Sequence, residues 1–151
     1  MEIVEGRLGD PDVEALLRLH RAESLASTPA DNAHTLDSAG LAKPGVRFFS
    51  AWDGEALLGI GALRAIDASH AEIKSMRTHP YHLRKGEARA LLVHLIDEAR
   101  AAGFARLSLE TGTAAMFDPA NAMYEAHGFA DCEAFAGYPS SRHNRFMTRV
   151  L

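Results

Sequence analysis

The chain has 151 residues, of which 47% are hydrophobic and 24% charged, and its formal net charge is -4 at pH 7. These values predict one globular domain over residues 1–151, large enough to bury a core without metal or disulfide staples. The acidic balance argues against general binding to nucleic acid, which needs an excess of Lys and Arg. The single cysteine, Cys132, cannot form an internal disulfide, and we expect a small buried side chain in a reducing compartment.

No stretch has the pattern of a targeting or membrane-spanning segment. Residues 1–6 lack the basic and apolar regions of a signal peptide, and no run approaches 18 apolar residues. We therefore expect a cytoplasmic protein with no membrane partner.

The first third of the chain predicts a strand, a helix and a long loop. Residues 2–7 alternate and predict a short strand. Asp10 and Pro11 supply a helix cap and a proline at the first helical position, and apolar residues continue at helical spacing to residue 26. Residues 27–45 predict a loop with one helical turn at 37–42. Such a loop is either functional or merely mobile, and the sequence leaves both interpretations open.

A three-stranded antiparallel meander is predicted next. Residues 46–52 form its first strand, Asp53-Gly54 is a hairpin turn, and residues 57–66 return as the second strand. Gly59 and Gly61 weaken the interior of that strand, so they indicate a bulge or a close packing approach.

Residues 71–78 predict the third strand, which ends at His79-Pro80. After a turn at residues 83–87, a helix with regularly spaced apolar positions runs to a stop at Ala102-Gly103. Strict alternation along the strand places two sets of side chains on opposite faces: Ile73, Ser75 and Arg77 on one, and Glu72, Lys74 and Met76 on the other.

The start of this helix is predicted to bind a pyrophosphate. Its first N–H groups have no intrahelical acceptor, and the helix dipole adds partial positive charge. Gly86 and Ala88 let phosphate oxygens approach the backbone, while Arg84, Lys85 and Arg89 add cationic donors. Neither a P-loop nor a dinucleotide-binding fingerprint is present. An ordinary helix start with a solvated basic face is the alternative.

The second half of the chain continues with a strand at residues 106–111, parallel to 71–78 in a right-handed unit. Asp118 caps a further helix, Pro119 opens it and Gly128 closes it. Residues 130–135 and 144–150 are predicted as an antiparallel pair of strands across the loop 136–143.

The order and spacing of these parts resemble the core of the GCN5-related N-acetyltransferase (GNAT) family. The resemblance lies in Arg77-Thr78-His79-Pro80, the turn and long helix, the strand that follows, and residues 123–129 (MYEAHGF), about half of the chain. Residues 72–78 (EIKSMRT), 109–112 (LETG) and 146–148 (FMT) resemble the bacterial YsnE-type subgroup, which supplies no substrate. The fold implied is α/β (α+β), a GNAT-like mixed, mostly antiparallel sheet of six to seven strands with a central parallel pair and about four flanking helices.

The resemblance implies an acyltransferase: an acetyl-CoA-dependent N-acetyltransferase that moves an acetyl group directly to the amine of a small molecule, such as an amino acid or related metabolite. Acetyl-CoA is then the cosubstrate, no metal is needed, and part of the loop 27–45 lines the acceptor site. The alternatives are a non-catalytic acyl-CoA-binding or regulatory module with the same fold, and a phosphate-ester or nucleotide binder that uses the same helix start. A homodimer and the identity of the acceptor stay open.

The family's coenzyme enters between two parallel strands that splay apart, and its pantetheine arm bonds to one of them. Carried over to this chain, that strand is residues 72–78, with Met76 and Thr78 as backbone contacts. The diphosphate would lie on the turn and helix start formed by Arg84, Lys85, Gly86, Glu87, Ala88 and Arg89.

The resemblance also implies the catalytic groups. Tyr124, four residues before Gly128, would protonate the departing thiolate, and the alternative is a tyrosine of the core. Glu72 is the preferred base and Glu110 the second choice, since both lie on strands flanking the gap. An ordinary ion pair between Lys74 and Glu72 is an equal alternative to the role of Glu72 as a base.

Three positions depart from the family pattern. Leu83 stands in place of Arg or Gln, Glu87 in place of an apolar residue, and Phe117 in place of an asparagine.

The remaining charged and histidine residues give no single interpretation. Arg142, His143 and Arg145 either attract an acidic acceptor or form a solvated rim. The eight histidines are scattered, so no metal site is expected.

Overall fold

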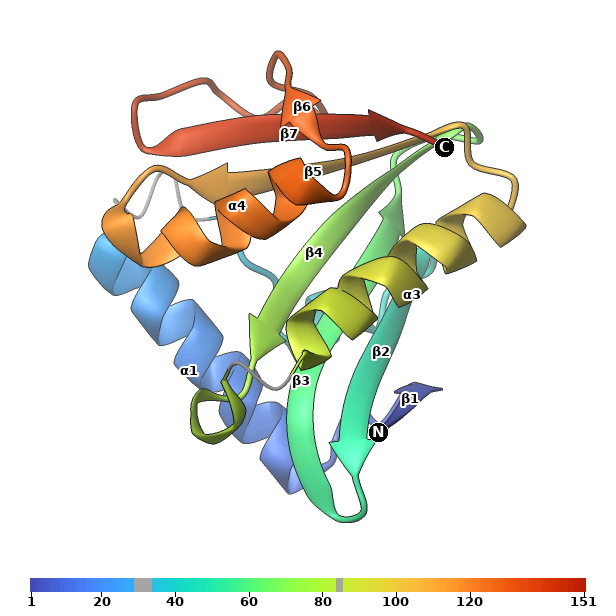
Figure 1. Cartoon of the computed structure of the whole chain (residues 1–151), viewed down its shortest axis with the longest axis vertical. Coiled ribbons are helices and arrows are strands. Elements are labelled where there is room, and N and C mark those ends of the chain that lie inside the picture. The colour runs from blue at the N-terminus through green and yellow to red at the C-terminus, as the bar shows by residue number, and fades with distance from the viewer. Residues whose placement is uncertain (29–33, 84–85) are drawn as a thin grey trace.

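A seven-stranded sheet organises the part of the chain described by the computed structural model, which is residues 1–28, 34–83 and 86–151 (Figure 1). The strand order is β1-β2-β3-β4-β5-β7-β6, and only β4 and β5 are parallel neighbours. The strands are β1 (Glu2–Glu5), β2 (Val46–Asp53), β3 (Ala56–Ala65), β4 (His70–Thr78), β5 (Arg106–Gly112), β6 (Ala130–Asp131) and β7 (Asn144–Val150).

Helices cover both faces of this sheet. The structure has α1 (Pro11–Ser27), α2 (Ser38–Leu41), α3 (Glu87–Ala101) and α4 (Asp118–Ala126), with short 3-10 turns at Pro80–His82 and Ala115–Phe117. α3 and α4 lie on one face and α1 on the other (Figure 1). The expected mixed sheet with one parallel pair and about four helices is therefore confirmed. Among the described residues, no helix is both long and apolar enough to span a membrane.

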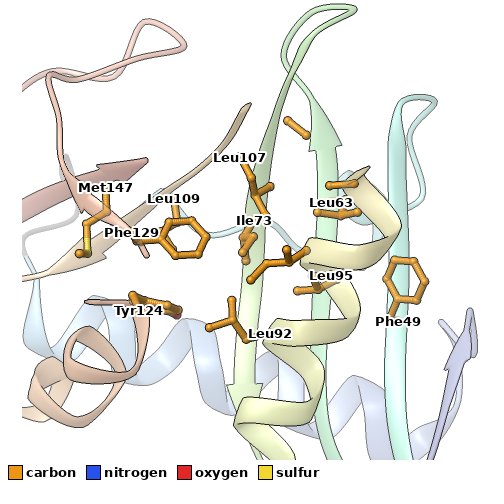
Figure 2. Packing of buried hydrophobic residues seen from close by; sticks show 13 residues of the cluster. Phe49, Leu63, Ile73, Leu92, Leu95, Leu107, Leu109, Tyr124, Phe129 and Met147 are labelled. Atoms are coloured by element: carbon orange, nitrogen blue, oxygen red, sulfur yellow. The ribbon is translucent and has the colours of Figure 1, made fainter. Parts of the chain in front are cut away.

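The main core lies between the sheet and the α3–α4 face (Figure 2). Leu92 and Leu95 of α3 pack with Ile73 of β4 and Leu109 of β5, and all four are at most 5% exposed. Tyr124 brings α4 onto the same cluster. A second cluster joins α1 to the opposite face of β2 and β3. The first core therefore fixes β4 and β5 beneath α3 and α4, and the second fixes α1 on β2 and β3.

Local signals set several element ends as expected. The Asp10 carboxylate accepts from the Asp12 N–H at 2.9 Å and the Val13 N–H at 3.4 Å, which caps α1. Asp37 caps α2 in the same way through the Gly40 N–H at 2.8 Å. Each cap satisfies N–H groups that the first helical turn leaves without acceptors.

Three expectations in the last third of the chain are wrong. Asp118 is the first residue of α4 rather than its cap, a position taken by Phe117. The strand expected over 130–135 is only β6 (Ala130–Asp131), because the chain turns to pack Phe135 against Phe146, with ring centroids 5.5 Å apart. Cys132, expected to be buried, is only half-buried.

Gly59 and Gly61 mark a close approach of α3 to the sheet. A Cβ at Gly59 would lie 2.9 Å from both the Arg77 carbonyl oxygen and a Leu91 methyl carbon, while one at Gly61 would lie 3.1 Å from a Leu95 methyl carbon. The close packing approach, one of the two alternatives, is therefore confirmed. A bulge is also present, but its extra residue lies in the partner strand β4 and not in β3.

We expect Gly59→Ala to lower the free energy of unfolding by about 1–3 kcal/mol, the usual cost of overpacking a core. Gly61→Ala is the matched control and should cost less, since its new methyl group meets only the end of a side chain. Urea denaturation of both variants tests this, and an equal or larger loss for Gly61→Ala would contradict it.

Candidate active site

The parallel strands β4 and β5 pair over only part of their length. Their register runs from His70 opposite Arg106 to Ile73 opposite Leu109 and stops there, although β4 continues to Thr78 and β5 to Gly112. β3 pairs with the far edge of β4, and β7 pairs with the far edge of β5. A wedge therefore opens between the two strands beyond Ile73, and the edge of β4 that faces it has no strand partner in the described part of the chain.

A bulge at Ser75 shapes the β4 side of this wedge. Ala62 lies opposite Lys74, and Ile60 lies opposite Arg77, so β4 has one residue more than β3 between these pairs. Ser75 takes a positive φ of 53°, which is unusual for a residue with a side chain. The bulge also shifts the alternation. Met76 packs with the core under α3 rather than on the face of Glu72, so strict alternation was wrong at this residue.

A cavity of about 140 Å³ fills the wedge and reaches both faces of the sheet. Its lining is apolar toward α4, where Leu109, Ala120 and Tyr124 contribute, and polar toward α1. The polar lining consists of His20, Ser24, Thr28, His34, Thr35, Lys74, Ser75, Glu110, Thr111, His143 and Asn144. An extended ligand can therefore enter between the strands with its reacting end among hydrogen-bonding groups.

Tyr124 lies where α4 faces the wedge. Its ring packs edge to face on Phe129 at a centroid distance of 6.0 Å, and the side chain both joins the core and lines the cavity. Burial raises the pKa of Tyr124 to about 12. The phenol is thus protonated at physiological pH. The two sequence interpretations, a core tyrosine and a proton donor, are compatible in this position.

Asn121 fixes the end of β5 against α4. Its Nδ2 donates to the Gly112 carbonyl oxygen at 3.0 Å, and its Oδ1 accepts from the Thr111 hydroxyl at 2.7 Å. Asn121 lies one helical turn before Tyr124, so it holds the tyrosine-bearing helix on the strand that borders the cavity. The role of Asn121 was not predicted, although a polar residue three positions before Tyr124 on the same helix was a signal that the sequence contained.

The start of α3 has the form of an anion site. Gly86 takes a left-handed φ of 82° at the N-cap of the helix, and no side chain of the described residues caps the first N–H groups. A Cβ at Gly86 would meet nothing within 4 Å, and Arg89 is exposed nearby. These features fit a bound diphosphate. Arg84 and Lys85, expected to contribute there, lie outside the described residues.

Glu87, the first residue of α3, is withdrawn from solvent. Its side chain is 1% exposed, and its Oε2 has no hydrogen-bond partner within the described ranges. A carboxylate in the first helical turn interacts favourably with the helix dipole. Gly86 before it has no side chain, and the half-buried Ala88 after it has only a methyl group. The backbone on either side of Glu87 therefore has little side-chain bulk around it.

Glu72, the preferred base, belongs to a buried polar network. It is fully buried, pairs with Arg64 at 3.0 Å, and accepts a hydrogen bond from the Tyr138 hydroxyl at 3.2 Å. Lys74 lies 3.8 Å from its other oxygen. Glu72 is not among the residues found to line the described cavity. The ion pair with Lys74, weighed from the sequence as an equal alternative, is thus present.

Glu110 is the carboxylate that lines the cavity. His34 Nδ1 lies 2.7 Å from Oε1 and 2.6 Å from Oε2, and Asn144 Nδ2 donates to Oε2 at 2.9 Å. Burial raises the pKa of Glu110, and the hydrogen bond from His34 opposes that rise. The sequence placed Glu110 at the gap but gave no sign of these two partners, which come from segments far away in the chain.

His20 is a half-buried histidine of the site. It follows Leu16 and Leu17 on the apolar stripe of α1 and lines the cavity, and its Nδ1 is buried without a partner among the residues described. Burial, with the nearby charge of Arg77, lowers the pKa of His20 to about 4. A histidine within an apolar helical stripe was the available sequence signal.

This pKa predicts that stability falls in mild acid. The neutral ring is favoured in the folded state, so the contribution of His20 is complete above pH 6.5 and is lost as the pH falls toward 4. Between pH 7 and 4 we expect the wild-type protein to lose about 3 kcal/mol more unfolding free energy than His20→Gln. Urea denaturation at both pH values measures the difference, and parallel losses would contradict the buried neutral ring.

Of the three sequence candidates Arg142, His143 and Arg145, only His143 reaches the cavity. Arg145 pairs with Asp131 at 2.6 Å and Glu125 at 2.7 Å on the outside of the sheet. In the described parts of the chain, no group of three or more His, Cys, Asp and Glu side chains is placed to hold a metal ion.

Comparison with known proteins gives a consistent result. The model of the acetyltransferase (GNAT) family matches residues 13–129. The uncharacterized N-acetyltransferase YedL of Escherichia coli (strain K12) is 46% identical over 144 residues, which cover 95% of this chain and 91% of that protein. The uncharacterized N-acetyltransferase YsnE of Bacillus subtilis (strain 168) is 45% identical over 139 residues, 92% of each chain.

A solved structure shares the fold. An acetyltransferase of Bacillus subtilis in complex with CoA aligns over 99% of this chain and 98% of its own, with a TM-score of 0.74 and 18% identity. The family match runs from α1 through the residues that follow α4, so it includes β4, β5, α3 and Tyr124.

Proposed function

Because the chain belongs to the acetyltransferase (GNAT) family, we propose that it moves an acetyl group directly from acetyl-CoA to the amine of a small molecule within the wedge between β4 and β5. The observation that carries the proposal is a set of three features: the wedge-facing part of β4 and Tyr124 line one cavity, and the start of α3, which follows β4 in the chain, carries no side-chain cap among the described residues.

The coenzyme would be held by backbone groups at two places. N–H groups at the start of α3, from Gly86 onward, would bind the diphosphate, with Arg89 as a cationic neighbour. The unpaired edge of β4 between Met76 and Thr78 would bond to the pantetheine arm as an added strand. A β4 N–H near the bulge would then polarise the thioester carbonyl.

The chemistry balances with one base and one acid. An ammonium acceptor gives one proton to a base facing the cavity, and the neutral nitrogen attacks the carbonyl carbon. As the N–C bond forms and the C–S bond breaks, the electron pair leaves on sulfur. Tyr124 gives its proton to the thiolate and recovers one from the acylated nitrogen. The third proton stays on the amide.

Glu110 is better placed than Glu72 to begin this sequence. Glu110 lines the cavity beside the polar groups, whereas Glu72 is fully buried and is occupied by Arg64 and Tyr138. The ammonium of the acceptor would therefore lose its proton to a group at the end of the cavity where Glu110 lies, and not to Glu72.

The cavity also supports a small acceptor. Its volume of about 140 Å³ is close to that of a protein cavity that holds one benzene molecule, about 150 Å³. Neutral hydrogen-bonding side chains such as Ser24, Thr28 and Thr35 line the acceptor end. A compact amine that carries further polar groups is the class that fits.

Two measurements test the proposed function. Calorimetry should show saturable binding of acetyl-CoA, and ATP should compete much less well than CoA. Incubation with acetyl-CoA and a panel of small primary amines should release free thiol. No binding at millimolar coenzyme would contradict the proposal, and binding without transfer to any amine would favour the non-catalytic alternative.

A further inference from the structure

A histidine and a glutamate from distant parts of the chain form a close pair at the polar end of the cavity. His34 and Glu110 are 76 residues apart, yet His34 Nδ1 lies within 2.7 Å of both carboxylate oxygens. The two side chains are 17% and 10% exposed, and both line the cavity. A nitrogen this close to a carboxylate on a largely buried pair carries the hydrogen of the bond.

Other contacts fix the position and plane of the imidazole. The His34 ring stacks on the Tyr138 ring with centroids 4.7 Å apart and planes 18° apart. The Lys74 ammonium donates to the His34 carbonyl oxygen at 2.7 Å and to the Tyr138 hydroxyl at 3.0 Å, so it ties both residues to β4. With Nδ1 directed to Glu110, the nitrogen left for a ligand is Nε2, which has no hydrogen-bond partner among the residues that the structure describes.

We propose that His34 Nε2 takes the proton from the acceptor amine and that Glu110 is a positioning residue behind it, an inference that rests on the proposed function. In such a dyad the carboxylate holds the imidazole in the tautomer with a proton on Nδ1 and stabilises the imidazolium that forms. The arrangement places an oriented base at the acceptor end of the cavity.

The contacts of Glu110 support this order of roles. Both of its oxygens face His34 Nδ1, and Oε2 also accepts from Asn144. To take a proton directly from the ammonium, a Glu110 oxygen would have to give up one of these hydrogen bonds. His34 Nε2 gives up no bond to the described residues when it accepts a proton.

The proton path is then complete at both ends. His34 takes the first proton of the ammonium and returns it to solvent after transfer. Tyr124, on the opposite lining of the same cavity, protonates the sulfur and recovers a proton from the nitrogen. No oxidant, metal or other reactant is required.

Two substitutions separate the roles of His34 and Glu110. Asn at position 34 keeps a donor nitrogen where Nδ1 stood but has no basic Nε2. We expect His34→Asn to lower kcat by about 10²–10⁴-fold, the range for loss of a general base, while the Kd for acetyl-CoA is unchanged. Glu110→Gln should lower kcat less, because removing the orienting carboxylate of a dyad costs less than removing its base. Near wild-type turnover in His34→Asn, or a larger loss in Glu110→Gln, would overturn the proposal.

A spectroscopic measurement tests the same proposal without any acceptor. In protein labelled with ¹⁵N-histidine, the long-range nitrogen–proton spectrum at pH 8 should show His34 with a proton on Nδ1 and a lone pair on Nε2. The signal is assigned by its loss in His34→Gln. A proton on Nε2 would overturn the proposal. If the wild-type protein did not bind acetyl-CoA, or did not transfer the acetyl group, that result would instead contradict the proposed function.

Discussion

Tyr124→Phe is expected to lower kcat by about 10²–10⁴-fold, while the Kd for acetyl-CoA stays within about twofold. Phenylalanine keeps the ring that packs on Phe129 and the core, so the fold and the coenzyme site are preserved. Only the hydroxyl that would protonate the thiolate is lost. Steady-state kinetics and calorimetry on the same preparation measure the two quantities.

Tyr81→Phe is the matched control for this change. Tyr81 is 85% exposed beside the turn before α3, so loss of its hydroxyl should change neither quantity. Unchanged kcat in Tyr124→Phe would leave Tyr124 with a packing role only and would remove it from the proposed chemistry.

The second large effect is expected at Lys74, whose side chain is 6% exposed beside the fully buried Glu72. Lys74→Met should lower the free energy of unfolding by about 3 kcal/mol, the lower end for breaking a buried ion pair, because Arg64 still pairs with Glu72. The change also removes the hydrogen bonds from Lys74 to Tyr138 and to the carbonyl oxygen of His34.

A double-mutant cycle isolates the ion pair in this loss. Lys74→Met with Glu72→Gln should be more stable than the sum of the two single changes predicts, because no unpaired buried carboxylate remains. Urea denaturation of the four proteins gives the coupling free energy. A coupling free energy near zero would show that the Lys74–Glu72 interaction does not contribute to stability, which would contradict this prediction.

The fold was largely predictable because its signals are local. Helix caps such as Asp10 and Asp37 and the Asp53-Gly54 hairpin depend on residues a few positions apart. Each signal acts through backbone geometry that neighbouring residues determine, so periodicity and turn chemistry were sufficient to place β1 to β5 and α1 to α4 along the chain.

The bulge at Ser75 and the short β6 were not predictable in the same way. Strict alternation assumes a flat ladder, whereas the positive φ of Ser75 inserts one residue into β4 and moves Met76 to the other face. β6 ends early because Phe135 finds aromatic partners across the sheet, which no local pattern in residues 130–135 reveals.

The candidate site was predictable in position but not in its partners. The sequence placed Tyr124 and Glu110 around the wedge, and both line the cavity. The contacts of His34 with Glu110, and of Lys74 with Tyr138, join residues 76 and 64 positions apart. Such pairs depend on how loops fold over the sheet, so spacing indicated the ion pair of Lys74 with Glu72 but gave no sign of Tyr138 in that network or of the pair formed by His34 and Glu110.

A crystal structure of the protein grown with acetyl-CoA tests the central claim most directly. It should show the diphosphate on the N–H groups at the start of α3, the pantetheine arm along β4 between Met76 and Thr78, and the thioester carbonyl in the cavity between Tyr124 and the pair of His34 and Glu110. A coenzyme bound outside the wedge, with β4 and β5 closed upon each other, would contradict it.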